Sequence, residues 1–258
     1  MSASTPPHGP APTNPRPGAH ADPDRAKTVS AVTAVAFDLE TTGVDPFGDA
    51  PVSFAFAWRE EPGPTATETG LIDPGRTIPV GATRVHGITD AMVAGAPDLA
   101  SAVPALADRL EAIWRDGGIV VGMNVAYDLT MIDSLLGRLG RASLGERGVG
   151  AVADVLVLDR HLDRYRRGKR TLTDLCVHYG VTLEGAHSAA VDAAASLELY
   201  ERLLERYPEI AATPVDLLTP NQAGWHREWL TSFSRYLERR GDAPVEPGRY
   251  DWPLHAAP

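Results

Sequence analysis

The stretch AVAFDLETTG, residues 34–43, begins as an apolar strand and ends in two acids. Side chains of a strand alternate between its faces, so Asp38 and Glu40 project from the same face. Carboxylates are rarely buried without a partner. Because a turn follows directly, Asp38 and Glu40 lie at the carboxyl end of the strand, where ligand sites gather in open α/β sheets. Taken alone, a D-x-E pattern is more often a pair of solvated acids, so a site needs further acids elsewhere.

The flanking sequence predicts an α/β fold. Apolar runs at 31–40 and 51–60, with Gly and Pro in the turn between them, indicate two strands, and 65–74 indicates a third. Strands this close in sequence are expected to pair as an antiparallel meander. Further along we expect a helix at 99–116, a strand at 117–124, a helix at 125–140, a strand or strand-to-helix passage at 150–160, and helices at 171–181 and 188–207. This alternation implies crossovers and helices on both faces of one sheet.

The ends of the chain differ in composition from this central part. Residues 1–29 are rich in Pro, Ala, Ser and Gly without periodicity, and are expected to be disordered. We place the main folded domain at 30–208 and a C-terminal extension at 209–258. Residues 221–240 predict an amphipathic helix, whose aromatic face we expect to pack on the domain, with docking onto a partner protein as the alternative. That face carries Trp225, Trp229, Phe233 and Tyr236 or Leu237.

The bulk composition excludes several classes of protein. The 258 residues carry a formal net charge of -10, so the chain is not a general polyanion binder. Its single cysteine allows no internal disulfide and fits a reducing cytoplasm, with a disulfide-free secreted protein as the alternative. No apolar run has transmembrane length and no signal-peptide pattern begins the chain, so we expect a cytoplasmic protein without a membrane partner.

Two further segments bring acids to the predicted site. In GIVVGMNVAYD, Asn124 ends a strand as a good N-cap, and Asp128 lies about one turn into the next helix. In HSAAVD, Asp192 lies in the first turns of a long helix, with His187 five residues earlier. Five helical residues turn side chains about 140° apart, so His187 must lie on the entering loop if both share a site. Ser188 can cap this helix, and its alanines allow a close approach to the sheet.

Four converging carboxylates repel one another unless cations are bound. Oxygen ligands select Mg²⁺ or Mn²⁺ over zinc, and two such ions form the arrangement that cleaves phosphodiesters. A histidine with a pKa near neutrality suits removal of a proton from the attacking water. The sequence therefore indicates metal-dependent phosphodiester hydrolysis.

FDLETTG, NVAYD and HSAAVD, in this order, closely resemble the three motifs of the DEDDh (DnaQ-like) 3′–5′ exonucleases, which include bacterial proofreading epsilon subunits, ribonuclease T and oligoribonuclease. VHGITD and LTDLCVHYGV resemble further segments of that family, and the match covers about residues 32–204. The N-terminal tail and everything past Pro208 resemble extensions of its actinobacterial members. The resemblance implies a ribonuclease H-like fold: a five-stranded mixed sheet, three antiparallel strands then two parallel, with helices on both faces.

The resemblance also implies residue roles. Asp38, Glu40, Asp128 and Asp192 would bind two Mg²⁺ or Mn²⁺ ions, with His187 as general base. Thr41 would meet the 3′-terminal nucleotide, His86 would line its pocket, and Val44 would lie between the terminal bases. Tyr127 stands where Phe is frequent, and His187 argues against the branch that carries tyrosine instead.

One basic cluster, RHLDRYRRGKR at 160–170, stands out in this acidic chain. It is either a solvated loop or a surface for the phosphates of the incoming strand. On the second interpretation the contacting residues are Arg166, Arg167, Lys169 and Arg170.

Together these features predict a 3′–5′ exonuclease that releases nucleoside monophosphates from single-stranded 3′ ends. DNA is favoured over RNA, in repair or in proofreading beside a DNA polymerase. The alternatives are a ribonuclease that trims short RNA, and a non-catalytic module of the same fold, which the five site residues oppose.

Overall fold

The computed structural model describes residues 27–60 and 63–257. Its sheet has the order β3-β2-β1-β4-β5, with β1 antiparallel to β2, β2 antiparallel to β3, and β1, β4 and β5 parallel. The strands are β1 (Ala34–Thr41), β2 (Pro51–Arg59), β3 (Thr65–Leu71), β4 (Ile119–Gly122) and β5 (Ala151–Asp154). The predicted five-stranded mixed sheet is confirmed.

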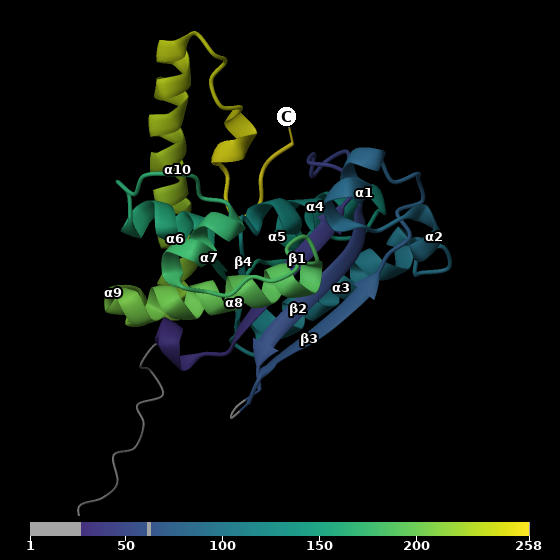
Figure 1. Cartoon of the computed structure of the whole chain (residues 1–258), viewed down its shortest axis with the longest axis horizontal. Helices are drawn as coiled ribbons and strands as arrows, with labels where there is room; N and C mark the ends of the chain where they lie inside the picture. The colour runs from purple at the N-terminus through teal and green to yellow at the C-terminus, as the bar shows by residue number, and fades with distance from the viewer. Residues whose placement is uncertain (1–26, 61–62, 258) are drawn as a thin grey trace, which may run out of the picture.

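Helices cover both faces of this sheet, as predicted (Figure 1). They are α1 (Val80–His86), α2 (Asp90–Val93), α3 (Leu99–Arg115), α4 (Ala126–Arg138), α5 (Leu144–Arg147), α6 (Val155–Leu162), α7 (Leu172–Tyr179), α8 (Ala189–Arg206), α9 (Pro208–Ala211) and α10 (Val215–Arg240), with short 3₁₀ turns at Val29–Ala31 and Pro247–Tyr250. The segment at 150–160, predicted as a strand or a strand-to-helix passage, is β5 followed by α6.

The alternating side chains of β1 show which helices pack on each face of the sheet. Val35, Phe37 and Leu39 pack with α3 and α4, whereas Ala36 belongs to the core formed with α8. Asp38 and Glu40 continue the row of Ala36, so they face the α8 side. Ala193 and Ala195 of α8 are buried against this face, which confirms that small residues line the contact.

The C-terminal extension packs on the domain. Helix α10 begins at Val215, six residues before its predicted start, and therefore contains Pro220. Trp225 stacks on His161 of α6, with ring centroids 3.9 Å apart, whereas Tyr236 near the helix end is 45% exposed. Figure 1 shows the outer half of α10 extending beyond the domain, with the chain then returning to it.

The N-terminal boundary differs from the prediction. Residues 1–26 of the predicted disordered tail lie outside the described residues. Val29, assigned to that tail, is buried, and its N–H donates to the Thr213 carbonyl. The folded part of the chain therefore includes the last residues before the predicted boundary. No helix among the described residues is long and apolar enough to cross a membrane.

Candidate active site

The acids of β1 and α8 meet at the carboxyl end of β1. Oxygen atoms of Asp38, Glu40 and Asp192 lie within 4.8 Å of one another. The β1–β4 ladder ends at Ala36, so the last residues of β1 are free of this neighbour. A register shift between Glu40 and Thr41 follows on the β2 side, and such bulges re-aim side chains beside active sites.

Asp128 reaches the same strand end from α4. Its carboxylate is buried and accepts a hydrogen bond of 3.1 Å from the Leu39 N–H, between the two acids of β1. The structure therefore brings together the four acids that the sequence singled out. In the described part of the chain, no lysine or arginine lies within ion-pair distance of any of the four.

Burial and mutual repulsion raise the pKa values of this cluster. The pKa of Asp38 is raised by burial and then by the charges of Asp128, Asp192 and Glu40. Burial, with the Asp192 charge, raises the pKa of Glu40 to about 7. Burial also raises the pKa of Asp128, against the hydrogen bond from Leu39. Clustered carboxylates without a cationic side chain fit divalent cations that prefer oxygen ligands.

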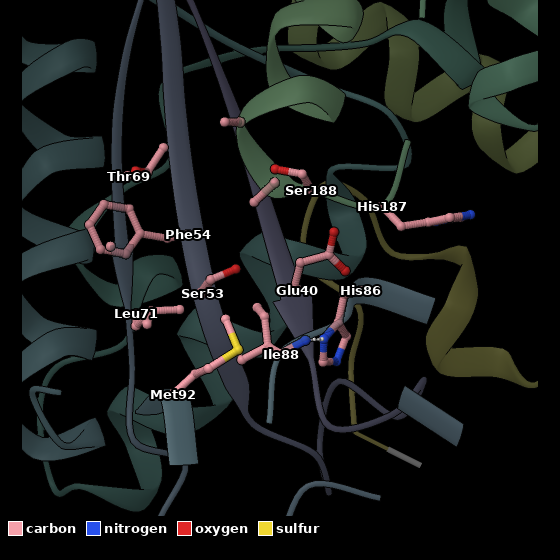
Figure 2. A pocket seen from close by; sticks show the side chains of 13 residues that line it. Glu40, Ser53, Phe54, Thr69, Leu71, His86, Ile88, Met92, His187 and Ser188 are labelled. Atoms are coloured by element: carbon pink, nitrogen blue, oxygen red, sulfur yellow. Dashed lines mark hydrogen bonds between the residues drawn. The ribbon is translucent and has the colours of Figure 1, made fainter. Parts of the chain in front are cut away.

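His187 lies on the loop entering α8, as the spacing required. Its backbone has φ 73°, and its N–H lies 3.3 Å and 3.4 Å from the two Asp192 carboxylate oxygens. The side chain is exposed and points away from Glu40 (Figure 2). Ser188 occupies the N-cap position but makes no capping hydrogen bond with its side chain, contrary to the prediction.

A pocket of about 320 Å³ opens beside the acids. Glu40, His86 and His187 contribute polar groups to its lining, and Phe54 and Met92 contribute apolar surface (Figure 2). His86 therefore lines a pocket beside Glu40, where the resemblance placed a nucleotide. Its Nδ1 accepts from the Ile88 N–H at 3.0 Å, while its Nε2 is buried without a hydrogen-bond partner in the described structure. Burial lowers the pKa of His86, so the ring favours its neutral form.

The turn after β1 is fixed by two hydroxyl groups. Thr41 Oγ1 and Tyr127 Oη both donate to the Gly43 carbonyl at 2.6 Å. Thr41 is thus half-buried beside Glu40, and Val44, the next residue of the turn, is 91% exposed. A phenylalanine in place of Tyr127 could not make this bond.

The basic cluster divides into two groups. Arg166 and Arg170 contact the fully buried Asp159, at 3.3 Å and 2.5 Å, and Tyr179 donates to the same carboxylate. These two arginines neutralise a buried acid, which gives their predicted phosphate contact no support. Arg167 and Lys169 are exposed, and their contact with phosphates stays a prediction.

Sequence reasoning missed Asp154 and misplaced the cap of α4. Asp154 ends β5, is buried, and accepts from the backbone N–H groups of Asn124 and Leu156. Burial raises its pKa to about 6, and its charge raises the pKa of Asp128. Val125, rather than Asn124, is the N-cap of α4, because Asn124 has φ 60°. The strand GAVAD ends in an acid just as AFDLE does, and that pattern could have revealed Asp154.

The family of this chain follows from comparison with known proteins. Residues 35–200 match the family described as Exonuclease (RNase_T). The chain belongs to this exonuclease family. Its matched region begins on β1 and ends in α8, so it contains all four acids and His187.

Relatives and solved structures agree with this family. The chain is 33% identical over 178 residues to a DNA polymerase III subunit epsilon-like protein of Rhodobacter capsulatus, covering 67% of this chain but only 24% of that protein. It is 25% identical to the DNA polymerase III subunit epsilon of Treponema pallidum, covering 68% and 78%. A complex of E. coli exonuclease I with single-stranded DNA superimposes with a TM-score of 0.57 at 19% identity, covering 78% of this chain and 45% of that one, which shows the shared fold.

Proposed function

We propose that the chain is a metal-dependent 3′–5′ exonuclease that releases nucleoside monophosphates from single-stranded 3′ ends, with DNA favoured over RNA. The observation that carries this proposal is the cluster of Asp38, Glu40, Asp128 and Asp192, without a cationic partner among the described residues, beside a pocket of about 320 Å³. The names of the DNA polymerase III relatives and the single-stranded DNA bound to exonuclease I support DNA as the substrate.

The four acids would hold two Mg²⁺ or Mn²⁺ ions. Such ions lower the pKa of a bound water and stabilise charge on the leaving 3′ oxygen. His187, on its exposed loop, would accept the proton of the attacking water after its side chain turns toward the acids. The neutral ring of His86 and the apolar side chains of the pocket would receive the terminal nucleotide, with Thr41 and Val44 at the turn beside it.

A cellular role follows by analogy with the relatives. Their names place epsilon-like chains with DNA polymerase III, so proofreading or repair beside a polymerase in the bacterial cytoplasm is the role we propose. The exposed Arg167 and Lys169 would contact backbone phosphates of the strand.

Asp38→Asn tests the proposal, with Asp116→Asn as its control. Asp116 is an exposed acid at the end of α3, near the start of β4, and it makes no ion pair among the described residues. Oligonucleotides labelled at the 5′ end report shortening from the 3′ end as a ladder, in Mg²⁺ or in EDTA. We expect Asp38→Asn to reduce the rate at least about 10³-fold, because it removes a carboxylate charge that would bind metal in the transition state.

The outcomes separate the proposal from its alternatives. Asp116→Asn should retain the wild-type rate, and EDTA should abolish it. Faster shortening of RNA than of DNA would overturn the DNA preference. Metal-dependent shortening that survives in Asp38→Asn would remove this cluster as the active site, and loss of label from the 5′ end would reverse the direction.

A further inference from the structure

A second pocket, of about 450 Å³, lies between the outer half of α10 and residues 241–257, here called the return segment. Its walls carry Trp229 and His226 of α10, Arg249 and His255 of the return segment, and Arg160 of α6. Except for Arg160 and Asn124, its lining lies beyond residue 200, outside the part of the chain that matches the exonuclease family. The pocket is therefore an addition of this chain to the family domain.

Arg160 is a desolvated cation without a direct anionic partner among the residues that the structure describes. Its guanidinium stacks on Trp229 with the central carbon 3.5 Å from the ring centroid, and its Nε is buried without a hydrogen-bond partner. No carboxylate of the described chain lies within ion-pair distance of it. Burial lowers the pKa of Arg160 to about 10, against the charges of Asp154 and Asp159. The aromatic contact fixes this group in place, and an anion in the pocket would restore its missing interactions.

Arg249 adds a second cation to the pocket. Its side chain is exposed and makes no ion pair within the described residues. Its backbone carbonyl accepts a hydrogen bond from His226 Nε2, at 2.9 Å. Burial lowers the pKa of His226 to about 4 and also lowers that of His255, so both rings are neutral near pH 7. Glu246 is the one acid among the described residues that line the pocket, so two cations face one carboxylate there.

This pocket lies on the same edge of the sheet as the acid cluster. Asn124, in its lining, follows β4, and its N–H donates to Asp154 at the end of β5. The His255 N–H donates to Thr130 of α4, the helix that also carries Asp128. A strand whose terminus lies at the acids can therefore continue along this edge toward α10.

We propose that this pocket binds a backbone phosphate of the single strand, upstream of the 3′ end held by the acid cluster. The planar donors of a fixed guanidinium match phosphate oxygens, and phosphates are the anions that a nucleic-acid strand presents repeatedly along that edge. That the phosphate belongs to a nucleic-acid strand rests on the proposed function. The anion site itself rests on Arg160, Arg249 and Trp229.

The test compares substrates that reach the pocket with substrates that do not. The kcat/KM ratio of an oligothymidylate of about 12 nucleotides to a trinucleotide measures the benefit of upstream contacts. We expect Arg160→Gln and Arg249→Gln each to lower this ratio about tenfold, the effect of one lost charge-assisted hydrogen bond. Arg235→Gln removes an exposed α10 arginine outside the pocket and should leave the ratio unchanged. Arg249→Gln keeps the test valid if Arg160→Gln fails to fold.

Binding experiments keep the pocket separate from catalysis. Fluorescence anisotropy with labelled oligothymidylate in EDTA should show weaker binding by Arg249→Gln, with a salt slope shallower by about 0.7 for the lost phosphate contact. Weaker binding would support the phosphate site even if the wild type cleaved neither substrate. Absence of cleavage by the wild type would contradict the proposed function and not the phosphate site. Equal ratios and equal binding in Arg249→Gln and Arg235→Gln would overturn the pocket. Competition by inorganic phosphate at matched ionic strength, without a length effect, would assign it to a free anion and overturn its role for the strand.

Discussion

Asp38 illustrates how a functional residue works against the stability of its own fold. It lies on β1 among Asp128, Asp192 and Glu40, without a cationic side chain within ion-pair distance in the described chain. Each acid is destabilising when ionised, because burial and like charges both favour the neutral form. A folded state with raised carboxyl pKa values binds more protons than the unfolded chain, so it loses stability as the pH rises.

The clustered acidic charges predict that the melting temperature depends on pH, and that bound metal reverses this dependence. In EDTA, the melting temperature should rise as the pH falls from about 8 to 6.5, because Glu40, with its pKa raised to about 7, becomes protonated in the folded state. This trend should hold only down to about pH 6.5. Below that pH, His226 and His255 bind protons more readily in the unfolded chain, because their pKa values are lowered in the folded state, and this lowers the stability. Mn²⁺ should instead stabilise the protein most at pH 8. Differential scanning fluorimetry measures both trends.

Asp38→Asn provides the control for this prediction. Without one of the repelling charges, the metal-free protein should melt several degrees higher at pH 8, since about 1 kcal/mol shifts a chain of this size by about 2–4 °C. The stabilisation by Mn²⁺ should disappear. A metal-free wild type that melts at the same temperature at pH 6.5 and 8 would contradict the raised carboxyl pKa values.

Residue spacing could predict the acids but not their partners. Asp38 and Glu40 share a face because side chains of a strand alternate with a period of two. Five residues along a helix turn two side chains about 140° apart, so His187 can share a site with Asp192 only from the loop before the helix. Nothing in the spacing of Arg166 and Arg170 indicates that both fold back on Asp159, because that contact joins α6 to the loop after it. The direction of the His187 side chain also depends on a loop with positive φ, which its sequence does not specify.

At the scale of elements, α10 completes the edge of the sheet. In the described part of the chain, strand β5 lies at the edge of the sheet, and side chains of α10 bind its free backbone groups. Gln222 donates to the Val152 carbonyl at 2.7 Å and accepts from the Asp154 N–H at 2.9 Å. Thr219 accepts from the Val152 N–H at 2.9 Å. The extension thereby protects an edge strand from pairing with another chain.

Gln222→Leu should destabilise the protein by about 2–4 kcal/mol. The leucine fills a similar buried volume, so the loss comes from two backbone groups left without partners. Thr231→Val is the control, because that hydroxyl binds only the Arg227 carbonyl of its own helix, and it should change stability by about 0.5 kcal/mol or less. Urea unfolding followed by circular dichroism compares the two. Equal losses would show that Gln222 adds nothing specific to the sheet edge.

The start of α10 shows why element boundaries are harder to predict than elements. Pro220 normally argues against a helix interior, since it lacks an N–H and crowds the preceding turn. Here the turns around it carry Leu218, buried in the core, together with Thr219 and Gln222, which bind β5. These long-range contacts stabilise the helix across the proline, and no local pattern around residue 220 indicates them.

For the whole molecule, the sheet order and the two helix layers follow from short-range patterns, whereas the path of the return segment does not. Residues 241–257 are rich in proline, and the sequence predicts them only as part of the extension. They return to the domain, where Trp252 is buried in the core that α3 and α4 share with β1. His255 is tied to Thr130 of α4. A segment without periodicity thus closes the core behind the helix that carries Asp128.

Trp252→Ala should therefore destabilise the whole domain, by about 3–5 kcal/mol, because a large side chain is removed from a packed core. Trp252→Phe is the matched variant: it keeps an aromatic ring and removes an indole N–H that is buried without a partner, so its loss should be about 1.5 kcal/mol or less. Tyr236→Ala, at an exposed aromatic of α10, should cost about 1 kcal/mol or less. Urea unfolding ranks the three. If Trp252→Ala lost no more than Tyr236→Ala, the return segment would be a loose tail, and the pocket that it forms with α10 would lose its wall.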